Sequence, residues 1–482
     1  MAKHIDTTKN TRAVGRAPIW IARVLAIALG AAAVSGIAIL AKVDVLPLPW
    51  LLGVGFAISL LAGLVVVFLW RTVAPPSWFR FMALSLVAVL GIAASALGIK
   101  AVGDVSSFFD GASPKTPATE YVVIALKDHD PNESSLQGQT LGELADDPNR
   151  EAVGAKLKSK FDSAFAQRAD PTELAAGLKA AEFSAAVLSS SILAIYEEAD
   201  PAFLESIQII YTFEVEAAAA APARPTAKPG EPFVVYISGI DTSGPINRVS
   251  RSDVNMLMVV NPSTGSVLLV NTPRDYYVQL HGTTGTKDKL THAGIYGVQK
   301  SIDTLQDLYE IDIDYYARVN FSSLVKIVDT LGGVDVDVDQ AFTSRNGNFS
   351  FTQGINHMNG EQALGFSRER YSFAAGDRAR GQNQQKVISA LIDKASQRSN
   401  LLRYDKLLDA LDGAVEMNVP MEQISSVVRQ RLEDGKSWQT ESISVDGTGD
   451  SLPTYSMGAQ KLYVMIPDEG TLKSARQKIA AT

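Results

Sequence analysis

Three long apolar runs without a charged residue dominate the first hundred positions of the chain. They cover residues 24–41, 45–70 and 81–99, and each can cross a bilayer as a helix that rises about 1.5 Å per residue. A cleaved signal peptide does not explain the first run, because two more runs follow it. Buried helices of a large soluble core rarely form successive uncharged runs with short polar joints. The pattern therefore predicts three transmembrane helices within residues 1–104.

Basic residues flank these runs unevenly. Five of them precede the first run, namely Lys3, Lys9, Arg12, Arg16 and Arg23. Arg71 and Arg80 bracket the joint between the second and third runs, whereas Lys42 is balanced by Asp44 in the other joint. Since basic residues in short loops favour the cytoplasmic side, we expect a multi-pass protein of the cell membrane. Its amino terminus would be cytoplasmic and the chain after about residue 104 extracytoplasmic.

The next hundred residues predict a small accessory domain. Within residues 105–216, an apolar run at 120–126 favours a strand, and residues 142–161 and 170–183 favour helices. This mixture is typical of an α/β domain. Residues 217–232, AAAAAPARPTAKPGEP, have no apolar periodicity and are rich in Ala and Pro, so we interpret them as a linker.

Residues 233–482 alternate strand and helix patterns. FVVYISGI, residues 233–240, is an apolar, β-branched run typical of a buried strand. Residues 255–275 hold two such runs joined by NPSTG, which favours an antiparallel hairpin. Helical spacing follows from Ile295 to Leu308, and residues 322–333 predict a helix that starts at serine and stops at glycine, between strands at 314–321 and 334–338. We therefore expect an α/β fold in which a mixed β-sheet is sandwiched between helices.

An arginine-rich segment begins at residue 368, RERYSFAAGDRARGQNQQ, although the formal net charge of the chain is −8. Arg380 and Gln384 stand four residues apart and align with the apolar stripe that starts at Val387, so both should lie near the core side of one helix. Asp377 is placed to cap this helix or to orient Arg380. A solvated basic surface would explain Arg378 but not Arg380, because a polar group near a core needs a partner.

Arg368 and Arg370 would share a face if their backbone is extended. The spacing of the whole segment therefore favours binding of an anion.

Further charged residues fall at the predicted ends of elements. Asp241 ends the first strand, Asp253 starts the next, and Arg251 lies between them. Two carboxylates at adjacent strand ends can share one hard cation. Arg274 follows a strand and Lys289 precedes a helix. Guanidinium forks for oxygen pairs, with a metal to bridge them, are the chemistry of phosphate recognition.

Taken together, these segments resemble a known family. YISGIDTSG, RSDVN, NTPRD, DKLTHAG, ALGFSRER and GDRARGQNQQKVI occur in the order and spacing of the LytR-CpsA-Psr family of Gram-positive bacteria. The resemblance is strong over residues 233–400. The three-helix anchor, the accessory domain and the tail at 401–482 are similar to the longer, capsule-associated branch of that family.

The resemblance implies an enzyme that moves a glycopolymer from a polyprenyl pyrophosphate carrier to peptidoglycan through a phosphodiester. The metal-linked aspartates would be Asp241 and Asp253, with Mg²⁺ or Mn²⁺ as cofactor. The catalytic pyrophosphate-binding side chains would be Arg251, Arg274, Arg368, Arg370, Arg380 and Gln384. Lys289 and Asp377 would complete substrate binding, and an apolar cavity would hold the polyprenyl tail.

Three other functions remain open at this point. A transcription attenuator is disfavoured, because an acidic chain with external domains offers no basic face for nucleic acid. A non-catalytic lipid-phosphate sensor would use the same anion site. A polyprenyl pyrophosphatase would use the same residues, with water attacking instead of a sugar hydroxyl. Thiolate catalysis and disulfides are excluded because the chain has no cysteine.

Overall fold

The computed structural model describes residues 17–43, 48–70, 78–129, 131–216, 227–240, 246–374, 376–395, 413–434 and 438–482. The chain forms two compact units. One comprises residues 1–107 with 424–435, and the other comprises residues 108–423 with 436–482.

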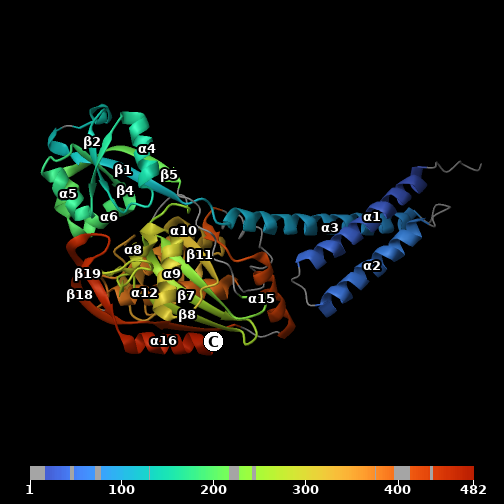
Figure 1. Cartoon of the computed structure of the whole chain (residues 1–482). Coiled ribbons are helices and arrows are strands. Elements are labelled where there is room, and N and C mark those ends of the chain that lie inside the picture. Colours follow the sequence, from blue (N-terminus) through green and yellow to red (C-terminus); the bar gives the residue numbers. More distant parts are fainter. Residues whose placement is uncertain are drawn as a thin grey trace, which may run out of the picture. The chain divides into compact units, whose positions relative to one another are not determined.

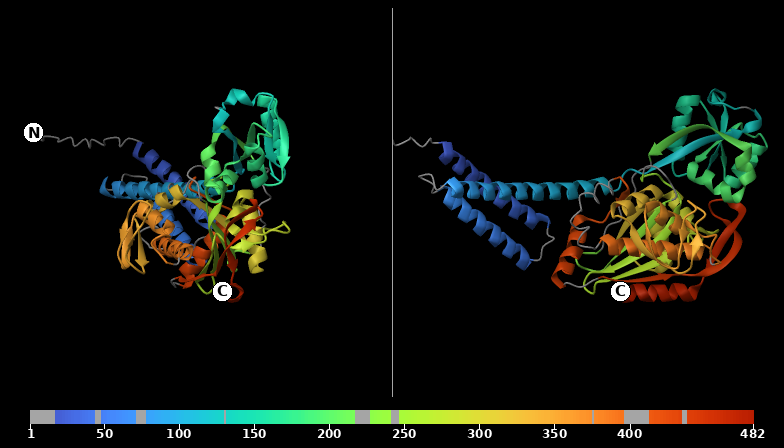
Figure 2. Two further views of the ribbon diagram at one scale, coloured as in Figure 1. Left: turned by 90° about the vertical axis from the view of Figure 1, so that its left-hand side faces the viewer. Right: turned by 180° about the vertical axis from the view of Figure 1, so that it is seen from behind.

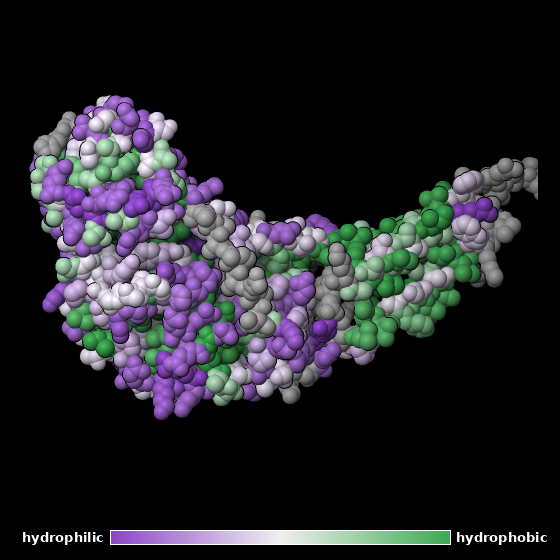
Figure 3. All heavy atoms as spheres, viewed as in Figure 1, coloured by the Kyte–Doolittle hydropathy of each residue, from purple (hydrophilic) through white to green (hydrophobic). Residues whose placement is uncertain are grey.

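Three long helices form the first unit: α1 (Ala17–Val43), α2 (Leu48–Trp70) and α3 (Trp78–Ala112), of which the last residues belong to the second unit (Figure 1). Each contains a stretch long and apolar enough to cross a membrane. Small residues such as Ala22 and Ala26 are buried between the helices, while Trp20, Phe56 and Leu64 are exposed. Figure 3 shows that the surface of these helices is largely hydrophobic. Their length and composition agree with the predicted membrane anchor.

The second unit begins with an accessory five-stranded sheet of order β3-β2-β4-β1-β5. Its strands are β1 (Ala118–Leu126), β2 (Thr140–Leu144), β3 (Ala164–Arg168), β4 (Ala185–Ser189) and β5 (Ile207–Glu216). Four α-helices, α4 (Arg150–Phe161), α5 (Pro171–Lys179), α6 (Ser190–Ala199) and α7 (Pro201–Ser206), and two short 3-10 turns, η1 (Lys127–His129) and η2 (Glu133–Leu136), connect them. Side chains of β1 alternate between two cores: Val123 packs with Leu157 of α4, and Val122 packs with Leu174 of α5. The sheet is thus covered by helices on both faces.

One correction concerns residues 142–161, for which the sequence predicts a helix. Residues up to Leu144 belong to β2, and α4 begins only at Arg150. Gly142 pairs in parallel with Ala166 of β3 and Ala186 of β4. This pairing between distant segments outweighs the local helical pattern.

A six-stranded mixed sheet of order β16-β11-β6-β7-β8-β17 forms the centre of residues 233–482, which the sequence predicts to be catalytic and which we call the catalytic region. The strands are β6 (Phe233–Ile240), β7 (Ser252–Asn261), β8 (Ser266–Thr272), β11 (Tyr315–Asn320), β16 (Val415–Met417) and β17 (Gln439–Ser444). β6 runs antiparallel to β7 and parallel to β11, and the predicted hairpin of β7 and β8 is confirmed. The ends of β6 and β11 and the start of β7 therefore meet at one edge of the sheet.

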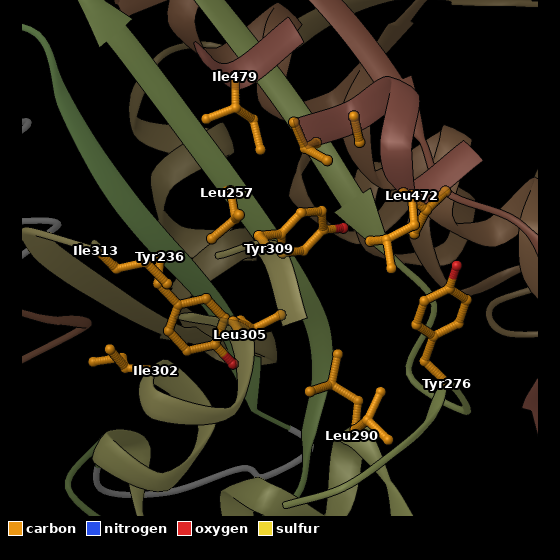
Figure 4. Close-up of a cluster of buried hydrophobic side chains, with 14 of the residues drawn as sticks. Tyr236, Leu257, Tyr276, Leu290, Ile302, Leu305, Tyr309, Ile313, Leu472 and Ile479 are labelled. Carbon is orange, nitrogen blue, oxygen red and sulfur yellow. The ribbon is translucent and has the colours of Figure 1, made fainter. Parts of the chain in front are cut away.

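Helices cover both faces of this sheet. On one face, α9 (Val298–Tyr309) and α16 (Glu469–Ala481) bury Leu305 and Leu472 against Leu257 of β7; Figure 4 shows this cluster. On the other face, Ile388 of α12 (Asp377–Ala395) packs against Met256. The predicted sandwich is confirmed, and α16 at the carboxyl end is part of it (Figure 2).

Shorter elements complete the catalytic region: α8 (Leu290–Ala293), the 3-10 turn η3 (Gly294–Tyr296), α10 (Phe321–Thr330) and α11 (Gly360–Arg368). Most of helix α15 (Met421–Asp434) belongs to the first unit. Small sheets pair β9 (Tyr277–Val278) with β10 (Asp288–Lys289), β12 (Val334–Val338) with β15 (Gly354–Met358), β13 (Phe342–Thr343) with β14 (Ser350–Phe351), and β18 (Gly447–Thr454) with β19 (Gly458–Pro467). The predicted strand at 334–338 therefore lies outside the central sheet. The helix expected to start at serine begins at Phe321, and Asn320 caps it by accepting a hydrogen bond from the backbone N–H of Ser323.

Candidate functional site

A cavity of about 720 Å³ opens at the sheet edge where β6, β7 and β11 meet. Five guanidinium side chains line it, those of Arg251, Arg274, Arg368, Arg370 and Arg380, together with Asp253 and Gln384. Apolar side chains form much of the remaining wall, including Ile237, Val254, Phe321, Leu324, Leu364, Val387 and Ile388. We call this cavity the arginine pocket. It joins residues that are more than 130 positions apart in the sequence.

Asp253 is a carboxylate that lies close to Arg274, Arg380 and Arg251 in the pocket. It accepts hydrogen bonds from Nη1 of Arg274, at 3.1 and 3.0 Å to its two oxygens, and from the hydroxyl of Thr291 at 3.2 Å. Burial alone would raise its pKa, but the positive charges of Arg274, Arg380 and Arg251 outweigh burial and lower the pKa to about 2. Asp253 is therefore ionised at any physiological pH.

The close approach of α12 to β8 positions Arg380. A Cβ atom on Gly381 would lie only 2.3 Å from Nδ2 of the Asn271 side chain, so a larger residue here would require that side chain to move. Arg380 itself is only 8% exposed, and Gln384 donates a hydrogen bond to the carbonyl of Ser367 at 3.4 Å. Both side chains line the pocket from α12, next to Val387 and Ile388. They lie on the inner side of the helix, as predicted from their spacing.

Arg368 and Arg370 lie at the carboxyl end of α11 and just after it. Arg368 is in the last turn, where a cation is favourable, and its guanidinium lies 4.1 Å from the ring centre of Phe321. Arg370 donates a hydrogen bond to the hydroxyl of Tyr371 at 2.6 Å. Between them, Glu369 is buried and accepts backbone hydrogen bonds from Tyr371 and Ser372. The backbone of Glu369 is extended, with φ −70° and ψ 129°, as considered from the sequence, and both arginines line the pocket.

Lys289 lies beside the pocket in an ion-pair cluster. Its ammonium group is 2.6 Å from Oε1 of Glu198 and 3.1 Å from Oδ1 of Asp275, and its side chain is 2% exposed. Asp275 and Glu198 both line the arginine pocket, Glu198 from helix α6 of the accessory domain. The accessory domain thus supplies part of the wall. Sequence reasoning missed Glu198 because an acid in an exposed helical turn carries no signal, and it missed Asp275 although it directly follows Arg274.

A buried Ser-His-Asp cluster next to Lys289 lacks the geometry of a hydrolase. Ser456 Oγ and Asp288 Oδ1 lie 2.8 and 2.7 Å from the same nitrogen, Nδ1 of His292. In a catalytic triad, serine and aspartate contact opposite nitrogens of the ring. All three side chains are buried, so the cluster fixes the segment that carries Lys289 and Thr291.

Two of the predicted site residues are described only partly or not at all. Asp241 lies outside the described residues, and of Asp377 only the place at the start of α12 is described. Within the described part of the chain, no group of three or more His, Cys, Asp or Glu side chains gathers to hold a metal ion. Asp253 nevertheless offers ionised oxygen atoms at the pocket wall, the donor type that Mg²⁺ and Mn²⁺ prefer. Ile240, the last residue of β6, lines the same pocket.

Comparison with known proteins places these features in a family. Residues 207–476 match the model of the LytR_cpsA_psr family. The chain is 34% identical over 220 residues to the polyisoprenyl-teichoic acid–peptidoglycan teichoic acid transferase TagU of Bacillus cereus, covering 45% of this chain and 70% of the relative. It is 31% identical over 252 residues to TagU of Halalkalibacterium halodurans, covering 51% and 79%. The crystal structure of B. subtilis TagV is 28% identical and covers 53% of this chain and 98% of that one, with a TM-score of 0.46.

The family model spans more than half of the chain and contains every described residue of the arginine pocket except the two glutamates of α6. The chain belongs to the LytR-CpsA-Psr family.

Proposed function

We propose that this protein transfers a glycopolymer from a polyprenyl pyrophosphate carrier to peptidoglycan and forms a phosphodiester link. The observation that carries this proposal is the arginine pocket, in which five guanidinium groups and an ionised Asp253 adjoin an apolar wall. Relatives at 31–34% identity are teichoic acid transferases that use a polyisoprenyl-linked substrate, according to their names.

The arginines bind and neutralise the pyrophosphate. Their planar forks match pairs of phosphate oxygens, and a group with two phosphates offers enough oxygens for several forks. As the acceptor hydroxyl attacks the phosphorus next to the sugar, the phosphoanhydride bond breaks and prenyl phosphate leaves. Negative charge moves onto the leaving oxygen, where fixed guanidinium groups stabilise it.

We propose that a divalent cation binds in this pocket. Asp253 would hold it, with Asp241 as the second ligand that the family resemblance implies, and bound Mg²⁺ or Mn²⁺ would supply further positive charge to the pyrophosphate. Arg274 and Thr291 fix the carboxylate of Asp253 in one orientation.

The apolar wall receives the beginning of the prenyl chain. Phe321, Leu324 and Leu364 line the pocket, and the ring centre of Phe321 lies 4.1 Å from the guanidinium of Arg368. A volume of about 720 Å³ is in the range of small-molecule sites, so the rest of a long polyprenyl chain would extend beyond it. Because the proposed extracytoplasmic domain is tethered to a membrane anchor by the chain, that remainder would stay in the bilayer.

A product analysis tests the proposal. The full-length protein in proteoliposomes receives a polyprenyl-pyrophosphate-linked glycopolymer and isolated peptidoglycan. We expect wall-bound polymer that is released by cleavage of a phosphodiester, and no product with Arg274→Ala. Free polymer alone would identify a pyrophosphatase, and binding without any product would identify a sensor.

A further inference from the structure

A second cavity, of about 530 Å³, lies between the accessory sheet and the catalytic region. Its accessory side includes Tyr121, Asp146 and Asn149, and its catalytic side includes Tyr296 and Tyr455. We call it the accessory groove. Its two sides are tied together, because the hydroxyl of Ser191 in α6 donates to the carbonyl of Val249 at 2.9 Å and Ala118 of β1 forms a β-bridge with Arg248.

The charge of the groove is opposite to that of the arginine pocket. Asp146, Asp147 and Asp170 line it, and none of its described lining residues is Lys or Arg. A phosphate-bearing polymer would meet only negative charge there. The groove therefore favours a neutral ligand that donates hydrogen bonds.

The polar groups of the groove are held in place and lie beside aromatic rings. Tyr121 donates to Asp147 at 2.6 Å, and Tyr455 points its hydroxyl at Asp146, 3.5 Å away. The rings of Tyr296 and Tyr455 lie 6.3 Å apart at 60°. Aromatic faces next to carboxylates suit a pyranose sugar, whose carbon-bound hydrogens pack on rings and whose hydroxyl groups donate to carboxylates.

Two elements connect the groove to the arginine pocket. Helix α6 contributes Ile192 to the groove and Glu198 to the pocket, six residues or about 9 Å apart along its axis. In the segment α8–η3, the hydroxyl of Thr291 donates a hydrogen bond to Asp253, and Tyr296 lines the groove. A Cβ on Gly294, between them, would lie 2.6 Å from the carbonyl oxygen of Ser250, so glycine is needed to seat this segment on β7. Wall residues of the two sites therefore lie on the same packed elements.

We propose that the accessory groove binds neutral sugar residues of a glycan strand that takes part in the transfer. This inference rests on the proposed function. Two strands have the required chemistry: the peptidoglycan acceptor and the first neutral sugars of the donor polymer. Either would continue from the groove toward the pyrophosphate held by the arginines.

The experiment uses the full-length protein in nanodiscs with Tyr455→Ala, Tyr455→Phe and Asp146→Asn. Asp450→Asn is the matched control, since Asp450 is exposed on β18 and lines neither cavity. Binding of an uncharged N-acetylglucosamine tetramer is titrated directly. We expect Tyr455→Ala to weaken it about five- to tenfold, Asp146→Asn to weaken it less, and Tyr455→Phe and Asp450→Asn to bind like the unmodified protein.

Steady-state transfer then separates the two strands. A rise in KM for peptidoglycan with unchanged kcat assigns the groove to the acceptor, and a rise in KM for the donor assigns it to the polymer. Unchanged tetramer binding and unchanged KM values in both Tyr455→Ala and Asp146→Asn would overturn the inference. If the unmodified protein transfers no polymer, the proposed function fails, while the tetramer titration still tests the groove by itself.

Discussion

Replacing Asp253 with Asn removes the negative charge that the arginines of the pocket surround. The pKa of Asp253 lies at about 2 instead of 3.8, a difference of about 1.8 pH units. A pKa shift of one unit between the unfolded and the folded state corresponds to about 1.4 kcal/mol. The ionised carboxylate therefore stabilises the folded protein by about 2 kcal/mol at pH 7. Asp253→Asn should therefore lower the free energy of unfolding by about that amount.

The pH dependence gives the sign of the effect. The folded-state pKa is lowered, so the stabilisation is complete above the unfolded pKa of 3.8 and is lost as the pH falls through about 2. The difference between Asp253→Asn and the unmodified protein should thus shrink to roughly half at pH 3.

Urea unfolding of the full-length protein measures this difference. Trp438 is the only tryptophan after residue 78 and packs against the sheet core near Met256, so its fluorescence reports on the catalytic region. Asp450→Asn, at an exposed carboxylate, is the control and should change little. Equal stability of Asp253→Asn and the unmodified protein at pH 7, or a difference that is the same at pH 3, would refute the electrostatic account of Asp253.

Three further predictions concern the pocket and the anchor. Arg380→Ala should reduce both the melting temperature and the transfer rate, because the Arg380 side chain is only 8% exposed. Arg378→Ala should affect neither, since the ion pair of Arg378 with Asp446 is exposed. Equal melting temperatures of the two variants would contradict this prediction. Glu198→Gln should leave Lys289 with Asp275 as its remaining negative partner and tighten donor binding measurably in a direct titration; weaker binding would speak against it. Protease added to intact protoplasts should digest the chain after residue 104 and spare an amino-terminal tag, and protection of residues 233–482 would disprove the proposed topology.

Local pattern was enough to predict much of the fold. The uncharged runs predict the helices α1 to α3, the NPSTG joint predicts the hairpin of β7 and β8, and the alternation of strands and helices predicts the sandwich. Residues 142–144 were wrongly placed in a helix, because parallel pairing with β3 and β4 is not visible locally. Strand order likewise depends on contacts between distant segments.

The residues that line the pocket could be predicted from the sequence where their spacing and the family resemblance agree. The five arginines, Asp253 and Gln384 all line one pocket. The role of Lys289 could not be read from its position, because its partner Glu198 lies 91 residues earlier in another domain. The contribution of the accessory domain to the pocket wall follows from that packing, which no periodicity in residues 105–216 reveals.

The central claim is that the arginine pocket binds the pyrophosphate of a lipid carrier, and a headgroup titration tests it most directly. A short-chain prenyl pyrophosphate, the corresponding monophosphate and the alcohol are titrated separately into the full-length protein and into Arg368→Ala. Each hydrogen bond to a charged group contributes about 1.5–3 kcal/mol, so we expect the pyrophosphate to bind at least tenfold more tightly than the monophosphate, and the alcohol to bind most weakly. Arg368→Ala should weaken binding of the pyrophosphate and leave binding of the alcohol unchanged. Equal affinities for the three headgroups, unaffected by Arg368→Ala, would contradict the account.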